Sequence, residues 1–308
     1  MNGHGLGRAW LLLGLGLAGL LLGACLLAPR PLGSRENPVK MAIVPFLETQ
    51  RLTVGMRKIA DYLERETGYA ITSEVPTSYV AVVEGMCAEK VDIGWVSPLA
   101  YILASKKCGA TMELVSVSRG GATAYRGLIV TRSDSDIHDL ADLQGKRFAW
   151  VDPGSTSGYL YPRALLLEKG LHPDKVFRQQ VFAGGHDKVI VAIMGGQVDA
   201  GAVYDDVRTT KGIQDLYPNI MTATRVIART DAIPNDGVAF RRGLPREMVE
   251  KIKAALLKLS GTPEGQALFQ EAIGTEGVKE TTDAAYDPVR RAAAVLNLDL
   301  EAELAKPK

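Results

Sequence analysis

The sequence predicts an α/β protein built from two Rossmann-like domains that a two-strand hinge joins. Apolar strands alternate with amphipathic helices along the chain, a pattern typical of largely parallel sheets with helices on both faces. One segment of the chain repeats once, and two further strands lead from one repeated unit to the other. The 308 residues are enough for two domains of ordinary size.

The N-terminus has the pattern of an export signal. Arg8 precedes an apolar stretch that is too short for a standard membrane span. Its end, Leu22-Gly-Ala-Cys25, resembles the lipobox of bacterial lipoproteins, in which the cysteine carries the lipid. We expect residues 1–25 to be a lipoprotein signal peptide that leaves a lipid anchor on Cys25, and residues 26–37 to be a tether. A plain secretory signal or an uncleaved anchor is the alternative.

The order of the elements follows from the periodicity of the apolar residues, which is two in strands and about three and a half in helices. Glycine, proline and asparagine separate the periodic segments. Strands are expected at 39–46, 70–76, 91–97, 112–118, 125–132, 147–152, 176–183, 199–204, 221–229 and 237–242. Helices are expected at 51–67, 79–89, 98–107, 155–169, 186–196, 207–217, 245–260, 263–273 and 283–305.

The repeat appears when the chain is aligned with itself at an offset of 107 positions. Residues 78–96 then match residues 185–203, and Val91-Asp-Ile-Gly-Trp-Val96 falls on Val198-Asp-Ala-Gly-Ala-Val203. Helix, turn and strand agree in register. We therefore expect two α/β units of the same build, with helix N-termini at the carboxyl ends of the strands.

The same offset pairs residues that begin helices. Thr49 falls on Thr156, each just after an apolar strand, and Tyr79 falls on His186. Tyr79 and His186 would each begin the second helix of its unit and face a shared crevice. A surface aromatic residue and a helix-capping residue are the alternatives for these two positions.

Two segments are predicted to cross between the units, Tyr125–Arg132 on the way out and Asp231–Arg242 on the way back. The first domain is then discontinuous, with residues 38–128 and 232–308, and the second domain is residues 129–231. Two connecting strands between such domains form a hinge around a cleft. This layout suits closure over a small ligand.

Three consecutive hydroxyl residues, Ser155, Thr156 and Ser157, lie between Gly154 and Gly158 at a predicted strand-to-helix turn. A helix N-terminus binds anions through its unpaired N–H groups and its dipole. Hydroxyl groups add neutral donors, and Gly154 is expected to let a ligand approach the backbone. An ordinary N-cap is the alternative, but a cap needs only one hydroxyl. The segment predicts a small oxyanion site without Lys or Arg.

Charge and cysteine content narrow the class of protein. Lys and Arg number 36 against 35 Asp and Glu, whereas nucleic-acid-binding proteins usually have a basic excess, so no nucleic-acid partner is expected. Cys87 and Cys108 of an exported chain either form a disulfide or remain as buried thiols. His138, His172 and His186 are far apart, and no Cys/His cluster has metal-site spacing. No metal and no cofactor is expected.

Several segments together resemble a known family, the phosphate/phosphite/phosphonate-type substrate-binding proteins of bacterial ABC transporters. That family has the type II periplasmic-binding-protein fold. The resemblance extends over roughly residues 38–290, in the correct order. The matching segments are Ser78–Met86, Val91–Tyr101, Asp152–Tyr159, Gly185–Val189, Val198–Ala202 and Ile233–Asp236.

The resemblance implies a role for each candidate residue. The run from Ser155 to Ser157 matches the hydroxyl groups that hold the phosphorus-bound oxygens. Tyr79 and Tyr125 match two donating tyrosines, and His186 matches a histidine that donates from the second domain, in its charged form on one hypothesis. No catalytic residue is implied.

Two carboxylates complete the implied site. Asp236, next to Asn235, matches an acidic residue beside the returning crossing. A carboxylate there can accept a hydrogen bond from a protonated phosphorus oxyanion but would repel sulfate, which has no such proton. Asp205 lies near the position where aminoalkylphosphonate binders have a carboxylate for the ligand's amine, and a solvated helix cap is its alternative.

The implied function is that of a monomeric substrate-binding lipoprotein in the cell envelope. It would deliver phosphate, phosphite or a phosphonate to an ABC permease and ATPase complex. One alternative is a binding protein that feeds a membrane sensor. Another is a hydrolase that uses Ser155–Ser157 with His186, but the centre of Gly154–Gly158 is Thr156, not the serine of a nucleophile elbow. A P-loop is excluded because no Gly-Lys-Ser/Thr follows.

Overall fold

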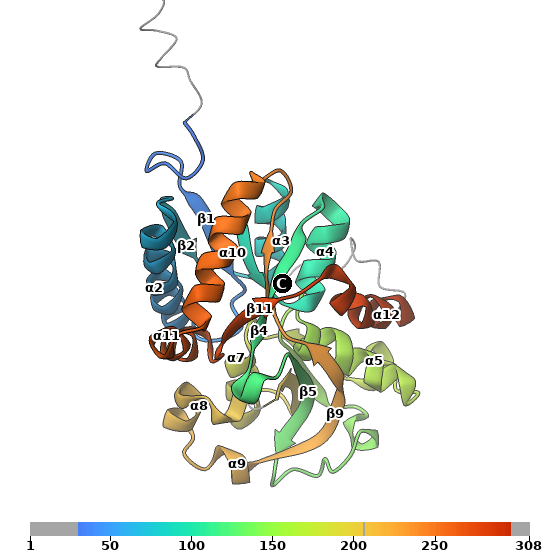
Figure 1. The fold of residues 1–308 in the computed structure, drawn as a ribbon. Helices are drawn as coiled ribbons and strands as arrows, with labels where there is room; N and C mark the ends of the chain where they lie inside the picture. Colours follow the sequence, from blue (N-terminus) through green and yellow to red (C-terminus); the bar gives the residue numbers. More distant parts are fainter. Residues whose placement is uncertain (1–29, 206, 297–308) are drawn as a thin grey trace, which may run out of the picture.

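The computed structural model describes residues 30–205 and 207–296 and consists of two lobes, one above the other in Figure 1. Each lobe contains one β-sheet, with six strands in the first lobe and five in the second. The predicted signal peptide, Cys25, the first residues of the tether and the end of the last predicted helix lie outside the described residues. Within the described ranges, no helix has both the length and the apolar composition that crossing a bilayer requires.

The first sheet has the strand order β11-β4-β10-β3-β1-β2. Strands β2, β1 and β3 are parallel, whereas β10 lies antiparallel between β3 and β4, and β11 is antiparallel to β4 at the edge. Its strands are β1 (Val39–Ile43), β2 (Ile71–Glu74), β3 (Ile93–Val96), β4 (Thr111–Val117), β10 (Gly237–Phe240) and β11 (Gly277–Glu280).

The helices of the first lobe form two groups, one containing α2, α10 and α11 and the other α3, α4 and α12 (Figure 1). Helix α12 also contacts α5 of the second lobe. These elements are α2 (Thr49–Thr67), α3 (Tyr79–Cys87), α4 (Pro98–Cys108), η1 (Arg119–Gly121), α10 (Arg246–Ser260), α11 (Pro263–Ile273), η5 (Asp283–Tyr286) and α12 (Asp287–Val295).

The second sheet has the strand order β7-β6-β8-β5-β9, with β7, β6 and β8 parallel and β5 antiparallel to both of its neighbours. Its strands are β5 (Ala124–Arg132), β6 (Arg147–Trp150), β7 (Gln179–Phe182), β8 (Ala200–Tyr204) and β9 (Thr224–Pro234). Its helices are η2 (Ala141–Leu143), η3 (Thr156–Leu160), α5 (Tyr161–Glu168), α6 (Pro173–Val176), α7 (His186–Met194), η4 (Val207–Thr209), α8 (Lys211–Leu216) and α9 (Ile220–Ala223).

The two sheets are built alike, which confirms the predicted repeat. The order β2-β1-β3-β10-β4 in the first lobe corresponds to β7-β6-β8-β5-β9 in the second. Helix α2 begins at Thr49 and η3 at Thr156, while α3 begins at Tyr79 and α7 at His186. The equivalence derived from the sequence therefore holds at the first residue of each helix.

The repeated Val-Asp-x-Gly motif has the same structural role in both lobes. The carboxylate of Asp92 accepts a hydrogen bond from the backbone N–H of Lys40, and that of Asp199 accepts one from the N–H of Arg147, each at 2.8 Å. Each bond joins the start of one parallel strand to the start of its neighbour. Arg241 and Arg147 then pair with the two carboxylates. The motif is therefore structural, and it repeats because the strand pairing repeats.

The two crossing strands pair with each other. Strand β5 runs antiparallel to β9, with Ala124 opposite Pro234 and Arg132 opposite Thr224. The expected domain boundaries, between 128 and 129 and between 231 and 232, fall inside these two strands. The hinge and the domain division remain predictions.

Several predicted elements differ from those observed. The sheets are mixed rather than largely parallel, because the crossing strands insert antiparallel beside the repeated units. The helix expected at 207–217 is broken into η4 and α8 and ends at Leu216 before Pro218, since proline disfavours helix at the residue before it. The start of the strand expected at 221–229 is the short helix α9. Strand β11 was not predicted, because only Gly277 and Val278 in it are buried.

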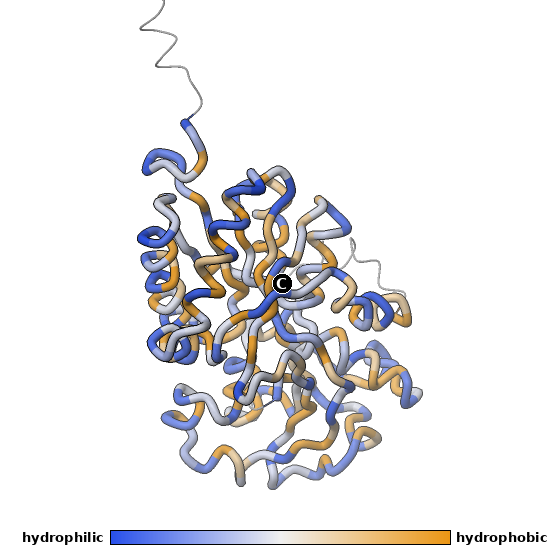
Figure 2. The backbone as a smooth tube through the Cα atoms, in the orientation of Figure 1, coloured by the Kyte–Doolittle hydropathy of each residue, from blue (hydrophilic) through white to orange (hydrophobic). Residues whose placement is uncertain are grey.

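Apolar side chains fill both lobes. In Figure 2 the hydrophobic colour runs along the segments inside each lobe, and the outer turns of the helices are hydrophilic. One core cluster extends from the first lobe into the second, and a separate cluster in the second lobe is rich in aromatic rings. In that cluster the rings of Phe148 and Phe177 stack with centroids 4.4 Å apart. Packed cores give the lobes defined surfaces on which a site can be built.

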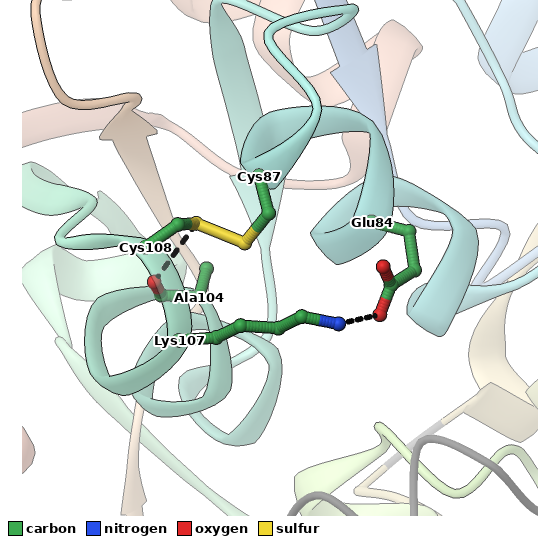
Figure 3. Close-up of a disulfide and its surroundings, with 5 residues drawn as sticks. All are labelled: Glu84, Cys87, Ala104, Lys107 and Cys108. Carbon is green, nitrogen blue, oxygen red and sulfur yellow. Dashed lines mark hydrogen bonds and ion pairs between the residues drawn. A yellow bond between two sulfur atoms is a disulfide. The ribbon is translucent and has the colours of Figure 1, made fainter.

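A disulfide joins Cys87, the last residue of α3, to Cys108, the last residue of α4 (Figure 3). Beside it, Lys107 forms an ion pair with Glu84. The sulfur of Cys108 lies 3.2 Å from the carbonyl oxygen of Ala104, a contact rather than a hydrogen bond because a bridged sulfur has no proton. The bridge holds together the ends of the two helices opposite to the N-termini that face the second lobe.

We expect Cys87→Ser/Cys108→Ser to lower the free energy of unfolding by about 3 kcal/mol, since the bridge constrains a loop of intermediate length in the unfolded chain. Ligand affinity should stay unchanged, because neither cysteine lines the cavity described below. Urea unfolding and calorimetry of the oxidised wild type and the double variant measure both quantities. A variant as stable as the wild type would contradict this expectation.

Candidate functional site

A cavity of about 820 Å³ lies between the two lobes. Residues that follow the carboxyl ends of strands in both sheets line it, including Phe46 after β1, Ser97 after β3, Ser155 after β6 and Asp205 after β8. This is the edge at which open α/β sheets bind ligands. The cavity is therefore where the repeat predicted a shared crevice.

The structure brings almost all of the predicted site residues to this cavity. Only Thr156 is not among the lining residues. The predicted residues that line it are Tyr79, Tyr125, Ser155, Ser157, His186, Asp205 and Asp236.

The hydroxyl run forms the start of a helix with an unusually wide first turn. Ser155 is the N-cap, and its Oγ accepts a hydrogen bond from the N–H of Gly158 at 3.0 Å. The carbonyl of Ser155 accepts from the N–H of Leu160, five residues on, which is the π-helical pattern often found at functional sites. The N–H groups of Thr156 and Ser157 have no acceptor within the helix. Together with the helix dipole, they favour an anion at this point.

The side chain of Thr156 joins the two lobes. Its Oγ1 accepts a hydrogen bond from the backbone N–H of Leu99 at 2.9 Å, in the first turn of α4. Next to it, Ser97 Oγ donates to the carbonyl oxygen of Gly154 at 2.7 Å. The backbone N–H of Thr156 can therefore bind an anion, while its hydroxyl oxygen accepts a hydrogen bond from the other lobe.

Two more hydrogen bonds complete this contact between the lobes. The N–H of Tyr79 donates to Asp152 Oδ2 at 3.4 Å, and the N–H of His186 donates to the carbonyl oxygen of Phe46 at 3.0 Å. We call these two bonds and the two made by Thr156 and Ser97 the lobe junction. It connects the N-termini of α3 and α4 with the segment after β6, and the N-terminus of α7 with the segment after β1.

Gly154 has a structural reason to be glycine at the lobe junction. A Cβ atom added at Gly154 would lie 2.8 Å from the Cβ of Tyr79. The size of residue 154 is therefore limited by α3 of the first lobe, and the approach of a ligand to this glycine stays a prediction.

Tyr79 and Tyr125 are neutral donors beside the hydroxyl run. Burial raises the pKa of Tyr79 well above its ordinary value, and the charge of Asp236 adds to this effect, while hydrogen bonding with Ser155 opposes it. The pKa of Tyr125 is raised by the same two causes, and hydrogen bonding with Ser157 opposes the shift. Both phenols therefore keep their protons and can donate them to an oxyanion.

His186 is neutral, which corrects the hypothesis of a charged histidine. Its Nδ1 accepts a hydrogen bond from the backbone N–H of Tyr204 at 2.9 Å, so the proton of the neutral ring is on Nε2. Burial lowers the pKa of His186 to about 3. The ring of Tyr204 packs edge-on against the imidazole with centroids 4.8 Å apart and helps to hold its orientation. His186 is thus another neutral donor.

Asp236 and Asn235 have separate roles. The amide of Asn235 donates to the carbonyl oxygen of Ser116 at 2.9 Å and to the Oγ of Ser118 at 3.0 Å, so it ties strand β4 to the returning crossing. Burial raises the pKa of Asp236 to about 7. Asp236 is therefore the titratable group among the neutral donors, and it can either accept or donate one proton near neutral pH.

Asp205 follows β8 at the rim of the cavity. Its N–H donates to the carbonyl oxygen of Arg126 at 2.8 Å, which fixes the backbone there. Its charge contributes to raising the pKa of Tyr125 and Tyr204, after the larger effect of burial. Asp205 thus lies near Tyr125 and Tyr204, two tyrosines of the second sheet.

Sequence reasoning missed several lining residues, among them Arg51, Ser116 and Tyr204. Arg51 lies in the first turn of α2. Since α2 begins at Thr49, the repeat equivalent of Thr156, the repeat could have identified it. The others lie within strands, where sequence alone does not show which face points to the cavity.

No group of His, Cys, Asp or Glu in residues 30–205 and 207–296 is arranged to hold a metal ion. The donors around the hydroxyl run are hydroxyl, phenol, imidazole and backbone N–H groups, with two carboxylates beside them. Chemically, this set suits a small oxyanion that carries a proton or shares one with Asp236. Three cations, Arg51, Arg119 and Lys211, line other parts of the cavity.

Comparison with known proteins agrees with this chemistry. Residues 41–286 match the family described as "ABC transporter, phosphonate, periplasmic substrate-binding protein". The phosphate-import protein PhnD of Mycolicibacterium smegmatis is 31% identical over 299 residues, which covers 90% of this chain and 92% of that protein. The phosphonates-binding periplasmic protein of Escherichia coli is 25% identical over 272 residues, with coverage of 87% and 79%.

Solved structures share the fold. A binding protein component of an ABC phosphonate transporter from Pseudomonas aeruginosa superposes with a TM-score of 0.77 at 22% identity, covering 90% of this chain and 96% of that one. PhnD1 from Prochlorococcus marinus, in complex with methylphosphonate, gives 0.74 at 18% identity, with coverage of 84% and 98%. These likenesses confirm the predicted type II periplasmic-binding-protein fold. With the family match and the 31% identical relative, they show that the chain belongs to the phosphonate-type periplasmic substrate-binding proteins of ABC transporters and works outside the cytoplasm.

Proposed function

We propose that this chain captures a phosphorus oxyanion in the cleft between its lobes and delivers it to an ABC permease and ATPase complex. The observation that carries the proposal is the convergence of neutral donors from both lobes on one cavity. Tyr79 comes from the first lobe, Tyr125 from a crossing strand, and Ser155, Ser157 and His186 from the second lobe. An anion bound by all of them would hold the lobes together.

The ligand class rests on Asp236 and on the relatives. An acid with a pKa of about 7 can share a proton with phosphate, phosphite or a phosphonate, whose own protons titrate in a similar range. The relatives named above include a phosphate-import protein and a protein solved with methylphosphonate. Both ligands are tetrahedral phosphorus oxyanions, which the donors of this cleft suit.

The chain acts as a binder and not as a hydrolase in this proposal. A nucleophilic serine needs a base within hydrogen-bond reach. The Nδ1 lone pair of His186 already accepts the Tyr204 N–H, and its Nε2 carries a proton, so the imidazole has no lone pair left to accept a serine proton. A monomer suffices, because the donors all come from one chain. The ABC family context favours a permease over a membrane sensor as the partner.

The lipid anchor is proposed on the Leu22-Gly-Ala-Cys25 pattern. Stable anchoring needs two or more acyl chains on the processed cysteine. Expression of Cys25→Ser in a bacterium should release the protein from the membrane fraction, while the wild type stays there after a salt wash. Retention of the variant in the membrane would instead indicate an uncleaved helix.

The hydroxyl run should contribute to anion affinity through Ser155 and Ser157. Each hydrogen bond to a charged ligand contributes about 1.5 kcal/mol or more, or roughly tenfold in Kd. Ser155→Ala/Ser157→Ala should therefore weaken the binding of phosphate and methylphosphonate by about a hundredfold in calorimetry. Ser73→Ala on strand β2, away from the cavity, is the matched control and should bind as the wild type does. Unchanged affinity in the double variant would exclude the hydroxyl run as the anion site.

Thr156 provides an internal contrast to the two serines. Thr156→Val leaves the N–H of Leu99 buried without its acceptor, which should lower the free energy of unfolding by about 1–3 kcal/mol, while Thr156→Ser should restore it. Urea unfolding of the two variants without ligand separates this role from anion binding.

Asp236 should make both stability and selectivity depend on pH. Its pKa rises from 3.8 in the unfolded chain to about 7 in the folded protein, so across that window the folded state holds a proton that the unfolded chain has released. Its contribution to stability therefore falls as pH rises from 3.8 to about 7. Asp236→Asn should remove this slope from the pH dependence of unfolding.

The preference for phosphate over sulfate should rise with pH, whereas the contribution of Asp236 to stability falls. Once Asp236 is ionised above a pH of about 7, it accepts a hydrogen bond from a protonated phosphate and repels sulfate. We expect the preference for phosphate over sulfate to grow as pH rises through this value and to be flat in Asp236→Asn. Equal binding of sulfate and phosphate by the wild type at pH 8.5 would refute the acceptor role.

A further inference from the structure

Arg51 is a fixed cation in the ligand cavity that the proposed oxyanion site does not use. It is half-buried in the first turn of α2 and lines the cavity. Its Nε donates to the carbonyl oxygen of Glu271 at 3.1 Å and its Nη2 to that of Gln270 at 3.4 Å. These carbonyls belong to the last turn of α11, whose negative dipole end favours a cation. The guanidinium is thus held at one place and keeps further N–H donors for another partner.

Arg51 forms no ion pair with a carboxylate among the residues that the structure describes. Lys58, on the same helix, shows the contrast, because its ammonium pairs with the side chain of Glu271 at 2.6 Å. A half-buried guanidinium that bonds only to neutral carbonyls keeps its full charge. In a ligand cavity, that charge attracts an anion.

The charge of Arg51 reaches the second lobe across the cavity. Burial raises the pKa of Tyr204, and Arg51 is the first of the charges that act on it, lowering it. Tyr204 in turn packs against His186, one of the proposed oxyanion donors. Arg51 therefore lies within electrostatic range of the oxyanion site without belonging to its neutral donor set.

The cavity has room for more than a tetrahedral oxyanion. Its volume of about 820 Å³ is near the upper end of the range for pockets that hold drug-sized ligands. Inorganic phosphate would fill only a small part of it. Two further cations line the cavity, Arg119 and Lys211, but both side chains are exposed, and Lys211 pairs with Asp215 at 2.6 Å. Of the three, Arg51 is the one fixed by the fold.

We propose that Arg51 forms a second anion subsite and that the preferred ligands are phosphorus oxyanions with a second anionic group, a carboxylate or another phosphoryl group, on a short chain. A guanidinium fork suits either group, since both accept paired N–H bonds. The inference rests on the proposed function, because the phosphorus end occupies the neutral donors around Ser155 and Ser157. The second group then extends toward α2.

The test compares by calorimetry two probes that differ in one terminal group, which is a methyl in propylphosphonate and a carboxylate in 3-phosphonopropionate. The wild type should bind 3-phosphonopropionate about tenfold more tightly or better, as expected for a charge-assisted hydrogen bond. Arg51→Gln should abolish that preference, with a smaller loss of affinity for propylphosphonate than for 3-phosphonopropionate. Arg51→Lys keeps the positive charge but loses the paired N–H donors of the guanidinium, so it should retain part of the preference.

Lys58→Gln is the matched control, because it removes a cation from the same helix and the same contact with α11 but does not line the cavity. It should keep the full preference. Thermal unfolding of all variants shows whether they are folded. If Arg51→Gln does not fold, the two-probe comparison on the wild type can still overturn the subsite, and Arg51→Lys tests the role of Arg51.

The possible outcomes are distinct. Equal affinity of the wild type for the two probes overturns the second subsite while leaving the proposed function intact. A loss in Arg51→Gln that is equal for both probes also overturns it and makes Arg51 a structural link between α2 and α11. If neither propylphosphonate nor methylphosphonate nor phosphate binds the wild type, the proposed function itself fails, and the subsite fails with it.

Discussion

The lobe junction is the contact on which the rest of the site depends. Backbone N–H groups at the N-termini of α3 and α4 donate to Asp152 and Thr156 of the second lobe, and the N–H of His186 donates to Phe46 of the first. Helix N-termini carry unpaired donors and positive partial charge. Some of these N–H groups donate to the other lobe, and the others face the cavity. The junction thus fixes the distance across which one anion can contact both walls.

Electrostatics inside the cleft follow from its burial. Low polarisability around the site keeps Tyr79, Tyr125 and His186 neutral, and it raises the pKa of Asp236 until that acid titrates near neutral pH. An anion bound by neutral donors experiences no fixed countercharge at its phosphorus end. The fixed charge is on Arg51, displaced toward α2 and held by the dipole end of α11. The neutral donors can therefore set the affinity for the phosphorus end, while Arg51 can set the choice among ligands that differ at the other end.

Much of the fold and part of the site could be predicted because they depend on local or repeated patterns. The offset that pairs Tyr79 with His186 identified the first residue of two helices, since equivalent turns need equivalent residues. The insertion of β10 and β5 between other strands could not be predicted, because strand pairing across distant segments leaves no periodic signal. The hydrogen bond that the hydroxyl oxygen of Thr156 accepts from the N–H of Leu99 could not be predicted either, because Leu99 is more than fifty positions away in the chain.

The sequence by itself determined the alternation of strands and helices, the repeat, and the run of hydroxyls at a helix N-terminus, because these follow from residue periodicity and from the unpaired donors of a first turn. Only the tertiary structure decided which donors face the cavity and which charges they carry. The neutral state of His186 requires the N–H of Tyr204, and the high pKa of Asp236 requires its burial in the folded chain. Protonation depends on desolvation and on partners from distant segments, which residue order alone does not specify.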